Sequence, residues 1–412
     1  MAVIENQRRA MLVLLVLSGL IISICMGLRQ SLGLFMRPMT LALGISSATF
    51  GFSIALQNIV WGLSQPLVGA LADRYGSRPV LIGTALTYAA GLLLMVFAKA
   101  VPGGLEIAGF LAGIGIAGTG FGVLIGTVSR ATQPERRSQT VGIVAAVGSL
   151  GTMVIAPIGQ GLIDGFGWKV AMVAFAAIAA SMALLSLPIR EQPVPKAHSP
   201  AVNQSLGEAV REAVGHRGYV CMTLAFFACG FQLVFLSTHL PAYLAVCGVA
   251  PGVSASALAL IGLFNSIGTY LFGLLGARYS QKRLLALIYL ARTLFIAAFL
   301  LVPVSVTSTL VFAAAMGLLW LGVVPLVTGI VGRIFGLAHF NTLYGIVFLS
   351  HQVGSFFGAW MGGVVFDRMG SYDFAWGALI VVGIAAFMLQ WLMDERPPRA
   401  RKDARHPAPA PA

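Results

Sequence analysis

Charged residues are scarce in this chain. Of its 412 residues, 9% are Asp, Glu, Lys or Arg and 58% are hydrophobic, with a mean hydropathy of +0.90. Soluble domains carry about 25% charged residues, so the composition excludes an ordinary soluble domain. The apolar runs are long and unbroken, unlike the alternating segments of about 10 residues in a membrane β-barrel. We therefore expect a polytopic helical membrane protein.

Acidic residues are fewer than basic ones, and cysteines are fewer still. Asp and Glu total 13 against 26 Lys and Arg, which gives a net charge of +13. The basic residues flank apolar segments, which indicates membrane topology rather than nucleic-acid binding. The four cysteines lack metal-like spacing, and no P-loop, zinc motif or nucleophile motif appears. We predict that the protein is not an enzyme and uses no metal and no cofactor.

Twelve segments are long enough to cross a bilayer as helices, which takes roughly 20 apolar residues each. The sequence therefore predicts an all-α membrane protein with twelve transmembrane helices. The segments are 11–36, 48–73, 79–100, 104–130, 138–163, 168–188, 217–246, 254–278, 283–303, 308–335, 340–366 and 371–394.

The positions of Lys and Arg predict the orientation. With a cytoplasmic N-terminus, 20 of the 26 fall on the cytoplasmic side, four fall outside, and Arg29 and Arg292 fall within the membrane. Cytoplasmic loops of membrane proteins carry an excess of Lys and Arg. We expect both termini in the cytoplasm and a location in a bacterial inner membrane.

One connection differs from the others because it is polar and rich in proline. Residues 189–216 form this predicted cytoplasmic linker, which separates an N-terminal six-helix half, 1–188, from a C-terminal six-helix half, 217–394. The remaining residues, 395–412, are rich in Arg, Pro and Ala, and we expect a disordered basic cytoplasmic tail.

The two halves carry traces of an internal repeat. At an offset of 204 residues, four positions of the second segment recur in the eighth: Gly69, Leu71, Arg74 and Tyr75 match Gly273, Leu275, Arg278 and Tyr279. At an offset of 203, five positions of the fifth segment recur at the eleventh: Gly151, Ala156, Gly159, Asp164 and Gly167 match Gly354, Ala359, Gly362, Asp367 and Gly370. Two halves of the same orientation, related by an axis along the membrane normal, follow from this repeat.

These motifs resemble those of a known family. The stretch Gly-Ala-Leu-Ala-Asp-Arg-Tyr-Gly-Ser-Arg at 69–78 resembles the signature loop of the major facilitator superfamily, and 148–161 is similar to its Gly/Pro-rich fifth-helix motif. Within the superfamily, 29–35 and 351–355 resemble bacterial relatives of monocarboxylate transporters and oxalate/formate exchangers. The resemblance implies the major facilitator fold, in which helices 1, 4, 7 and 10 line the path of the substrate.

Arg29 lies two-thirds of the way along the first apolar segment. A guanidinium at that depth costs at least about 2.5 kcal/mol and cannot shed its proton. No acidic residue can be placed in the middle of an apolar segment, so we predict that a small organic anion supplies the missing charge. The planar fork of Arg suits a carboxylate. The alternative is a structural pair with a backbone carbonyl or with an unplaced acid.

Estimated depths place further candidates for substrate binding near the middle of the membrane. His351 is also a candidate for proton coupling because imidazole titrates near neutral pH, with a neutral hydrogen-bonding role as the alternative. Arg292 has the alternative of a structural bond to the backbone. The candidates besides Arg29 are Gln57, Trp61, Gln232, Asn265, Arg292, Trp320 and His351.

Asp73, Arg74 and Arg78 lie where the second segment meets the cytoplasm. A carboxylate there can pair with arginines or with the positive end of a neighbouring helix. We predict a cytoplasmic gate that forms when the halves close on that side and breaks when they open. A role in topology alone is the alternative.

The chain departs from proton-coupled monocarboxylate transporters in the eighth helix. Asn265 and Thr269 stand where those relatives carry an acidic and a basic residue four positions apart. The departure favours exchange or facilitated passage over proton symport through a carboxylate, while His351 keeps proton coupling open.

The leading prediction is a secondary or facilitative transporter of a monocarboxylate or dicarboxylate by alternating access. Its expected partners are the anion, the lipid bilayer, and either a proton or a counter-anion. We expect a monomer and no nucleic-acid partner. The alternative is a proton-coupled exporter of drugs or other hydrophobic molecules, but such exporters usually hold an acid inside the membrane, and we find none.

Overall fold

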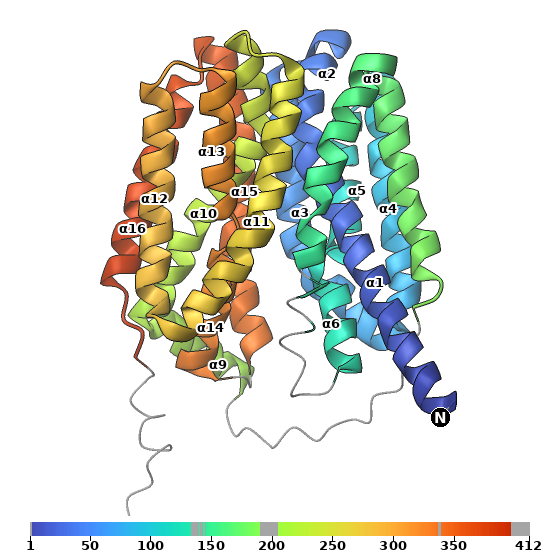
Figure 1. Cartoon of the computed structure of the whole chain (residues 1–412), viewed down its shortest axis with the longest axis vertical. Coiled ribbons are helices and arrows are strands. Elements are labelled where there is room, and N and C mark those ends of the chain that lie inside the picture. Colours follow the sequence, from blue (N-terminus) through green and yellow to red (C-terminus); the bar gives the residue numbers. More distant parts are fainter. Residues whose placement is uncertain are drawn as a thin grey trace, which may run out of the picture.

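The computed structural model describes residues 2–132, 140, 143–144, 146–189, 205–336 and 339–396. They form a bundle of long helices in two groups that stand side by side (Figure 1). Most of the predicted linker, 190–204, and most of the predicted tail, 397–412, lie outside the described residues.

The first group is α1 (Ala2–Ser31), the 3-10 helix η1 (Leu32–Phe35), α2 (Met36–Leu43), α3 (Ser47–Tyr75), α4 (Ser77–Val96), α5 (Gly104–Thr119), α6 (Phe121–Ala131) and α8 (Gly151–Ser186). The short α9 (Leu206–Gly215) precedes the second group. That group is α10 (Arg217–Val246), α11 (Pro251–Arg278), α12 (Gln281–Leu301), α13 (Val306–Leu318), α14 (Val323–Phe335), α15 (Phe340–Met369) and α16 (Asp373–Leu392).

Ten helical stretches among the described residues are long and apolar enough to cross a membrane. One of them, Ala146–Ser186, contains the backbone kink at Gly167, where φ is 81°, and therefore supplies two crossings. The 30-residue α15 is less apolar and is not one of the ten, but it packs against the spanning helices α3 and α10 and supplies a further crossing. The prediction of an all-α protein with twelve transmembrane helices is confirmed.

Two predicted segments are broken rather than continuous, which corrects the sequence-based picture. The segment 104–130 is divided at Gly120, between α5 and α6, and the segment 308–335 is divided at 319–322, between α13 and α14. Gly120 has extended backbone angles, φ −77° and ψ −155°. Since a break exposes backbone groups that a membrane cannot hydrogen bond, neighbouring side chains must satisfy them.

The helices that carry the internal repeat also join the two halves. α3 packs against α15, and α8 packs against α11. Glycines allow the backbones to approach closely: a side chain at Gly51 of α3 would overlap the Ala359 carbonyl of α15, and one at Gly262 of α11 would overlap Thr152 and Met153 of α8. Small residues permit such contacts in membrane bundles.

The upper ends of the two halves in Figure 1 are tied by a carboxylate. Asp367, near the end of α15, accepts hydrogen bonds from the backbone N–H groups of Ser47 at 3.0 Å and Ala48 at 2.6 Å. These groups lie in the first turn of α3, where the helix dipole favours negative charge. The side chain of Arg37 adds a bond to the Ala245 carbonyl at 3.4 Å.

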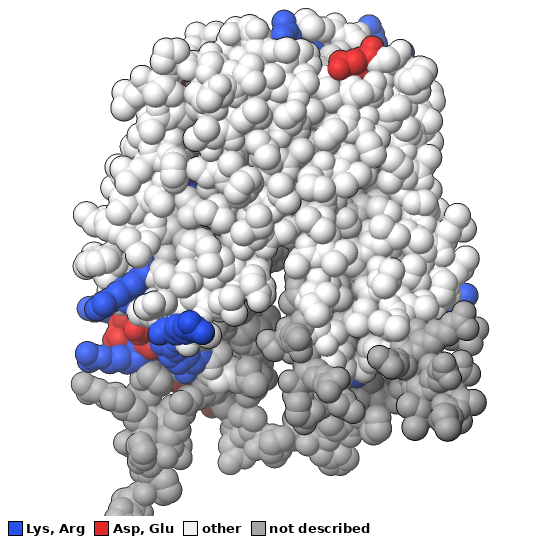
Figure 2. Space-filling view, in the orientation of Figure 1, with Lys and Arg blue, Asp and Glu red and all other residues white. Residues whose placement is uncertain are grey.

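The lower ends of the halves diverge. Figure 2 shows a hollow between the two groups toward this end, and a middle band that is almost bare of charge. Asp73 pairs with Arg130 at 3.0 Å, and both residues belong to the first group. Arg74 lies over the ring of its neighbour Tyr75. The contact of Asp73 with Arg130 therefore does not join the halves.

Replacing Asp367 by Ala is expected to loosen the upper ends, because both charge-assisted bonds to α3 are lost. The bonds are solvent-exposed, so we expect the population open at this end to rise about two- to tenfold. Spin labels at Leu41 of α2 and Val246 of α10, which are 74% and 58% exposed, would report the distance between the upper ends of the two halves. The measurement is double electron–electron resonance in a background without the native cysteines.

The matched control is Asp373→Ala, an exposed acid at the start of α16 near the same end. It should leave the distance distribution unchanged. Identical distributions for the Asp367→Ala variant and the unchanged protein would contradict the role given to Asp367.

Candidate functional site

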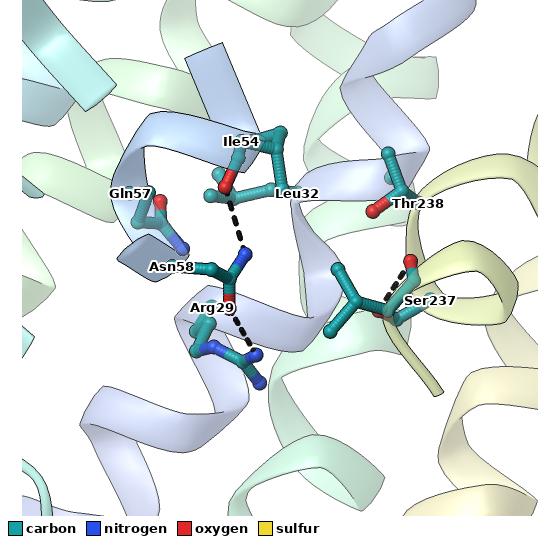
Figure 3. A pocket seen from close by; sticks show the side chains of 9 residues that line it. Arg29, Leu32, Ile54, Gln57, Asn58, Ser237 and Thr238 are labelled. Carbon is teal, nitrogen blue, oxygen red and sulfur yellow. Dashed lines mark hydrogen bonds between the residues drawn. The ribbon is translucent and has the colours of Figure 1, made fainter. Parts of the chain in front are cut away.

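Arg29 lies in the last turn of α1, just before the 3-10 helix η1 begins. One terminal nitrogen donates a hydrogen bond to the Oδ1 atom of Asn58 at 2.6 Å, and the guanidinium lies 5.0 Å from the ring centre of Trp61. Its Nε atom is buried and makes no hydrogen bond within the described residues. The partners of this cation are thus an amide dipole and an aromatic face (Figure 3).

No carboxylate among the described residues forms an ion pair with Arg29. The ion pairs found there join Arg130 to Asp73 and Arg333 to Glu395, at the lower end of the molecule. The side chain of Arg29 is only partly buried. An accessible cation in a low-dielectric interior without a counter-charge attracts anions strongly.

A cavity of about 10 Å³ lies beside Arg29. Both halves of the molecule line it, because α1, η1 and α3 face α10 across it (Figure 3). η1 and α10 approach each other closely beside the cavity, because a side chain on Gly33 would overlap the backbone of Ser237. The lining residues are Arg29, Leu32, Gly33, Ile54, Gln57, Asn58, Val234, Ser237 and Thr238.

Gln57 faces this cavity from α3 with its hydrogen-bonding capacity unused. The residue is fully buried, yet neither its Oε1 nor its Nε2 has a partner within the described residues. Leaving a buried amide unpaired costs roughly 1–3 kcal/mol per group. Such a group is expected to bond to a ligand or to water that enters the cavity.

A row of aromatic side chains leads from Arg29 to His351. The ring of Trp61 meets Phe348 edge-on at 5.3 Å, and Phe348 is stacked on His351 at 5.9 Å. The imidazole Nδ1 lies 3.0 Å from the Oε1 of Gln352, whose amide donates to the Asn58 carbonyl at 2.7 Å. The structure therefore brings Arg29, Gln57, Trp61 and His351 into one connected region.

Arg292 lies elsewhere. It is fully buried, and its guanidinium donates to the backbone carbonyls of Leu319 and Trp320, where the chain is broken between α13 and α14. Asn265 completes this arrangement by accepting the Leu321 N–H at 3.0 Å. The break leaves these backbone groups without helical partners, which is the physical reason that Arg292, Asn265 and Trp320 are engaged here and do not line the Arg29 cavity.

Gln232 also faces away from the cavity. Its amide nitrogen donates to the Leu379 carbonyl of α16 at 3.1 Å. The residues of α10 that line the cavity are instead Val234, Ser237 and Thr238. Depth along a helix places a residue near the midplane but does not fix the side of the helix on which it lies.

Three polar cavity residues were missed by sequence reasoning: Asn58, Ser237 and Thr238. Asn58 is adjacent to Gln57 in an otherwise apolar stretch, and a buried amide there is the signal that could have indicated it. Ser237 and Thr238 give no such signal, because hydroxyl side chains in membrane helices commonly bond to their own backbone, as Ser237 does to Val234.

Comparison with known proteins identifies the class. A family model described as the Major Facilitator Superfamily matches residues 11–328, and the chain belongs to this family. It is 25% identical to "Monocarboxylate transporter 13" of Rattus norvegicus over 88% of this chain and 83% of that protein. It is 24% identical to "Oxalate:formate antiporter" of Oxalobacter formigenes over 91% and 88% of the two chains.

Solved structures support the fold. A bacterial homologue of the human lysosomal transporter Spinster superposes with a TM-score of 0.75 at 16% identity, over 95% of this chain and 99% of that one. A D-xylose-proton symporter superposes with a TM-score of 0.71, also at 16% identity, over 93% and 97%. At this level of identity, the likeness concerns the fold alone.

Replacing Arg292 by Met is expected to destabilise the protein by about 2 kcal/mol, because the carbonyls at the break between α13 and α14 would lose their donor inside a membrane. Thermal denaturation in detergent measures this loss. The control is Arg368→Met, which removes an exposed Arg at the end of α15 and should leave the melting temperature unchanged. Equal melting temperatures for both variants would refute the structural role.

Proposed function

We propose that this chain is a secondary or facilitative transporter that binds a small organic anion at Arg29 and carries it by alternating access. One observation carries the proposal: the guanidinium is partly exposed beside a polar cavity, and its contacts among the described residues are neutral. The names of the relatives, a monocarboxylate transporter and an oxalate:formate antiporter, agree with a carboxylate as cargo.

In this proposal, Arg29 binds the carboxylate with two N–H groups, and Gln57 supplies the second polar contact. The Trp61 ring lies against the guanidinium, 5.0 Å from it. Arg292 is committed to the backbone of 319–320 and supplies no second positive charge. A single accessible cation favours a monocarboxylate over a dicarboxylate, because a second negative charge would be left without a counter-charge in the membrane.

The orientation proposed from the sequence places the lower end of Figure 1 in the cytoplasm of a bacterial cell, with both chain termini there. Basic side chains gather at the lower end of the visible face, near the end of α11 and the start of α12 (Figure 2). With that orientation the structure is an inward-facing state: Asp367 holds the outer ends together, while Asp73 is paired within its own half.

We further propose that 1–188 and 217–394 move as two bodies, with 189–216 as the linker between them. The halves meet where α3 packs against α15 and α8 packs against α11, and the cavity lies between α1 and α3 of one half and α10 of the other, so rocking of the halves would expose it to each side in turn. Asp73, Arg74 and Arg78 would form the cytoplasmic gate in the outward-facing state. A monomer is sufficient for transport in this proposal, because a single chain supplies both sides of the cavity.

Replacing Arg29 by Met is expected to lower carboxylate uptake by at least about 30-fold, because the buried anion would lose its charged partner. Removing an unpaired cation from the membrane interior should not impair folding. Uptake of labelled formate, lactate, pyruvate and oxalate into proteoliposomes is the measurement, with Arg368→Met as the control that also removes one positive charge.

Undiminished uptake by the Arg29→Met variant would remove the basis of the proposal. Thermal-shift assays with the same acids and with lipophilic cations separate this function from the export of hydrophobic molecules. Stabilisation by the cations alone would favour the exporter.

Replacing His351 by Gln is expected to leave anion exchange within about threefold of the unchanged protein. The imidazole lies between aromatic rings and hydrogen bonds to an amide, which a Gln can also do. Exchange of labelled pyruvate should likewise be insensitive to an imposed pH gradient. Accumulation driven by that gradient, and lost in the His351→Gln variant, would establish proton coupling through His351 instead.

A further inference from the structure

The carboxamide of Asn58 is held in one orientation by its own helix. Its Nδ2 donates to the Ile54 carbonyl one turn earlier at 2.7 Å, so that Oδ1 is directed at Arg29 (Figure 3). The side chain is almost fully buried. Because the amide nitrogen is engaged, Asn58 presents only an acceptor to the cation.

The cavity beside Arg29 is too small for a carboxylate. At about 10 Å³ it offers the space of one water molecule, whereas a carboxylate group has three heavy atoms. A carboxamide has the same planar shape and size as a carboxylate. A cargo can therefore reach the Arg29 fork if its carboxylate takes the place that the Asn58 carboxamide now occupies.

We propose that Asn58 acts as a stand-in for the carboxylate in the empty carrier. This inference rests on the proposed function. With no cargo, the Asn58 oxygen bonds to Arg29 and, together with the Trp61 ring, lowers the cost of the unpaired cation. The empty carrier can then pass between its two states, and the transporter can move anions in one direction as well as exchange them.

Arriving cargo displaces the carboxamide from Arg29. The bond between the halves from Gln352 goes to the backbone carbonyl of Asn58, so a change of the Asn58 side chain leaves that bond in place. Substitutions here therefore test the contact with Arg29 separately from the packing of the halves.

The test compares two modes of transport in proteoliposomes loaded with a labelled carboxylate, with pyruvate tried first and then the other acids of the panel above. Exchange is measured with unlabelled anion outside. Net efflux is measured with no anion outside, and valinomycin with potassium prevents a voltage from building up.

The Asn58→Leu variant should keep exchange, with a KM about tenfold lower because no internal acceptor competes for Arg29. Its net efflux should fall at least about tenfold, because the bare cation would have to cross without an acceptor. The Asn58→Asp variant supplies a resident charge and should behave oppositely, with net efflux maintained and an exchange KM at least about tenfold higher. Gln390→Leu is the matched control, since it removes a fully buried amide from α16.

A ratio of net efflux to exchange in the Asn58→Leu variant equal to that of the unchanged protein would overturn the inference. A raised exchange KM in that variant would also overturn it, because Asn58 would then align Arg29 for the cargo. Should Asn58→Leu not fold, an Asn58→Asp variant with unchanged KM would decide against the inference. Failure of the unchanged protein to carry any acid of the panel would instead refute the proposed function.

Discussion

An unneutralised guanidinium inside the membrane is the constraint on which the candidate site depends. Arg29 contacts the Asn58 amide and the Trp61 ring, each of which offers a partial negative charge. A hydrogen bond to a charged group contributes about 1.5–3 kcal/mol and a cation–π contact about 0.5–2 kcal/mol. These contacts reduce the cost of burying the cation without cancelling its charge, so the site keeps an electrostatic preference for anions.

Arg292 is also a cation inside the membrane, but its hydrogen bonds go to backbone carbonyls. Arg292 donates to the free carbonyls at the break in the tenth crossing, and Asn265 accepts a free N–H from the same break. A broken helix and a buried cation, each costly in a membrane, thus satisfy one another. At the corresponding position of the first half, 204 residues before Arg292, the chain carries Tyr88 instead of an arginine. The two halves therefore share a fold but not a site.

The sequence was sufficient to predict the twelve transmembrane helices, because each is a long apolar run bounded by charged residues or glycines. It also located Arg29, since a lone cation in the first segment is visible without a structure. It did not predict the breaks, because Gly120 and Gly322 are indistinguishable from the many glycines that pack membrane helices. Nor could depth alone separate Gln57, which faces the cavity, from Gln232, which faces α16. That distinction depends on helix rotation, which is set by packing partners distant in the sequence.

The most direct measurement of the central claim is a crystal structure of the protein with (methylseleno)acetate, a carboxylate that does not alkylate thiols, with anomalous diffraction recorded at the selenium edge. We predict a selenium peak in the cavity between α1, α3 and α10, with the carboxylate bonded to the Arg29 guanidinium. A selenium peak remote from Arg29, with the guanidinium still bonded to Asn58, would contradict this claim.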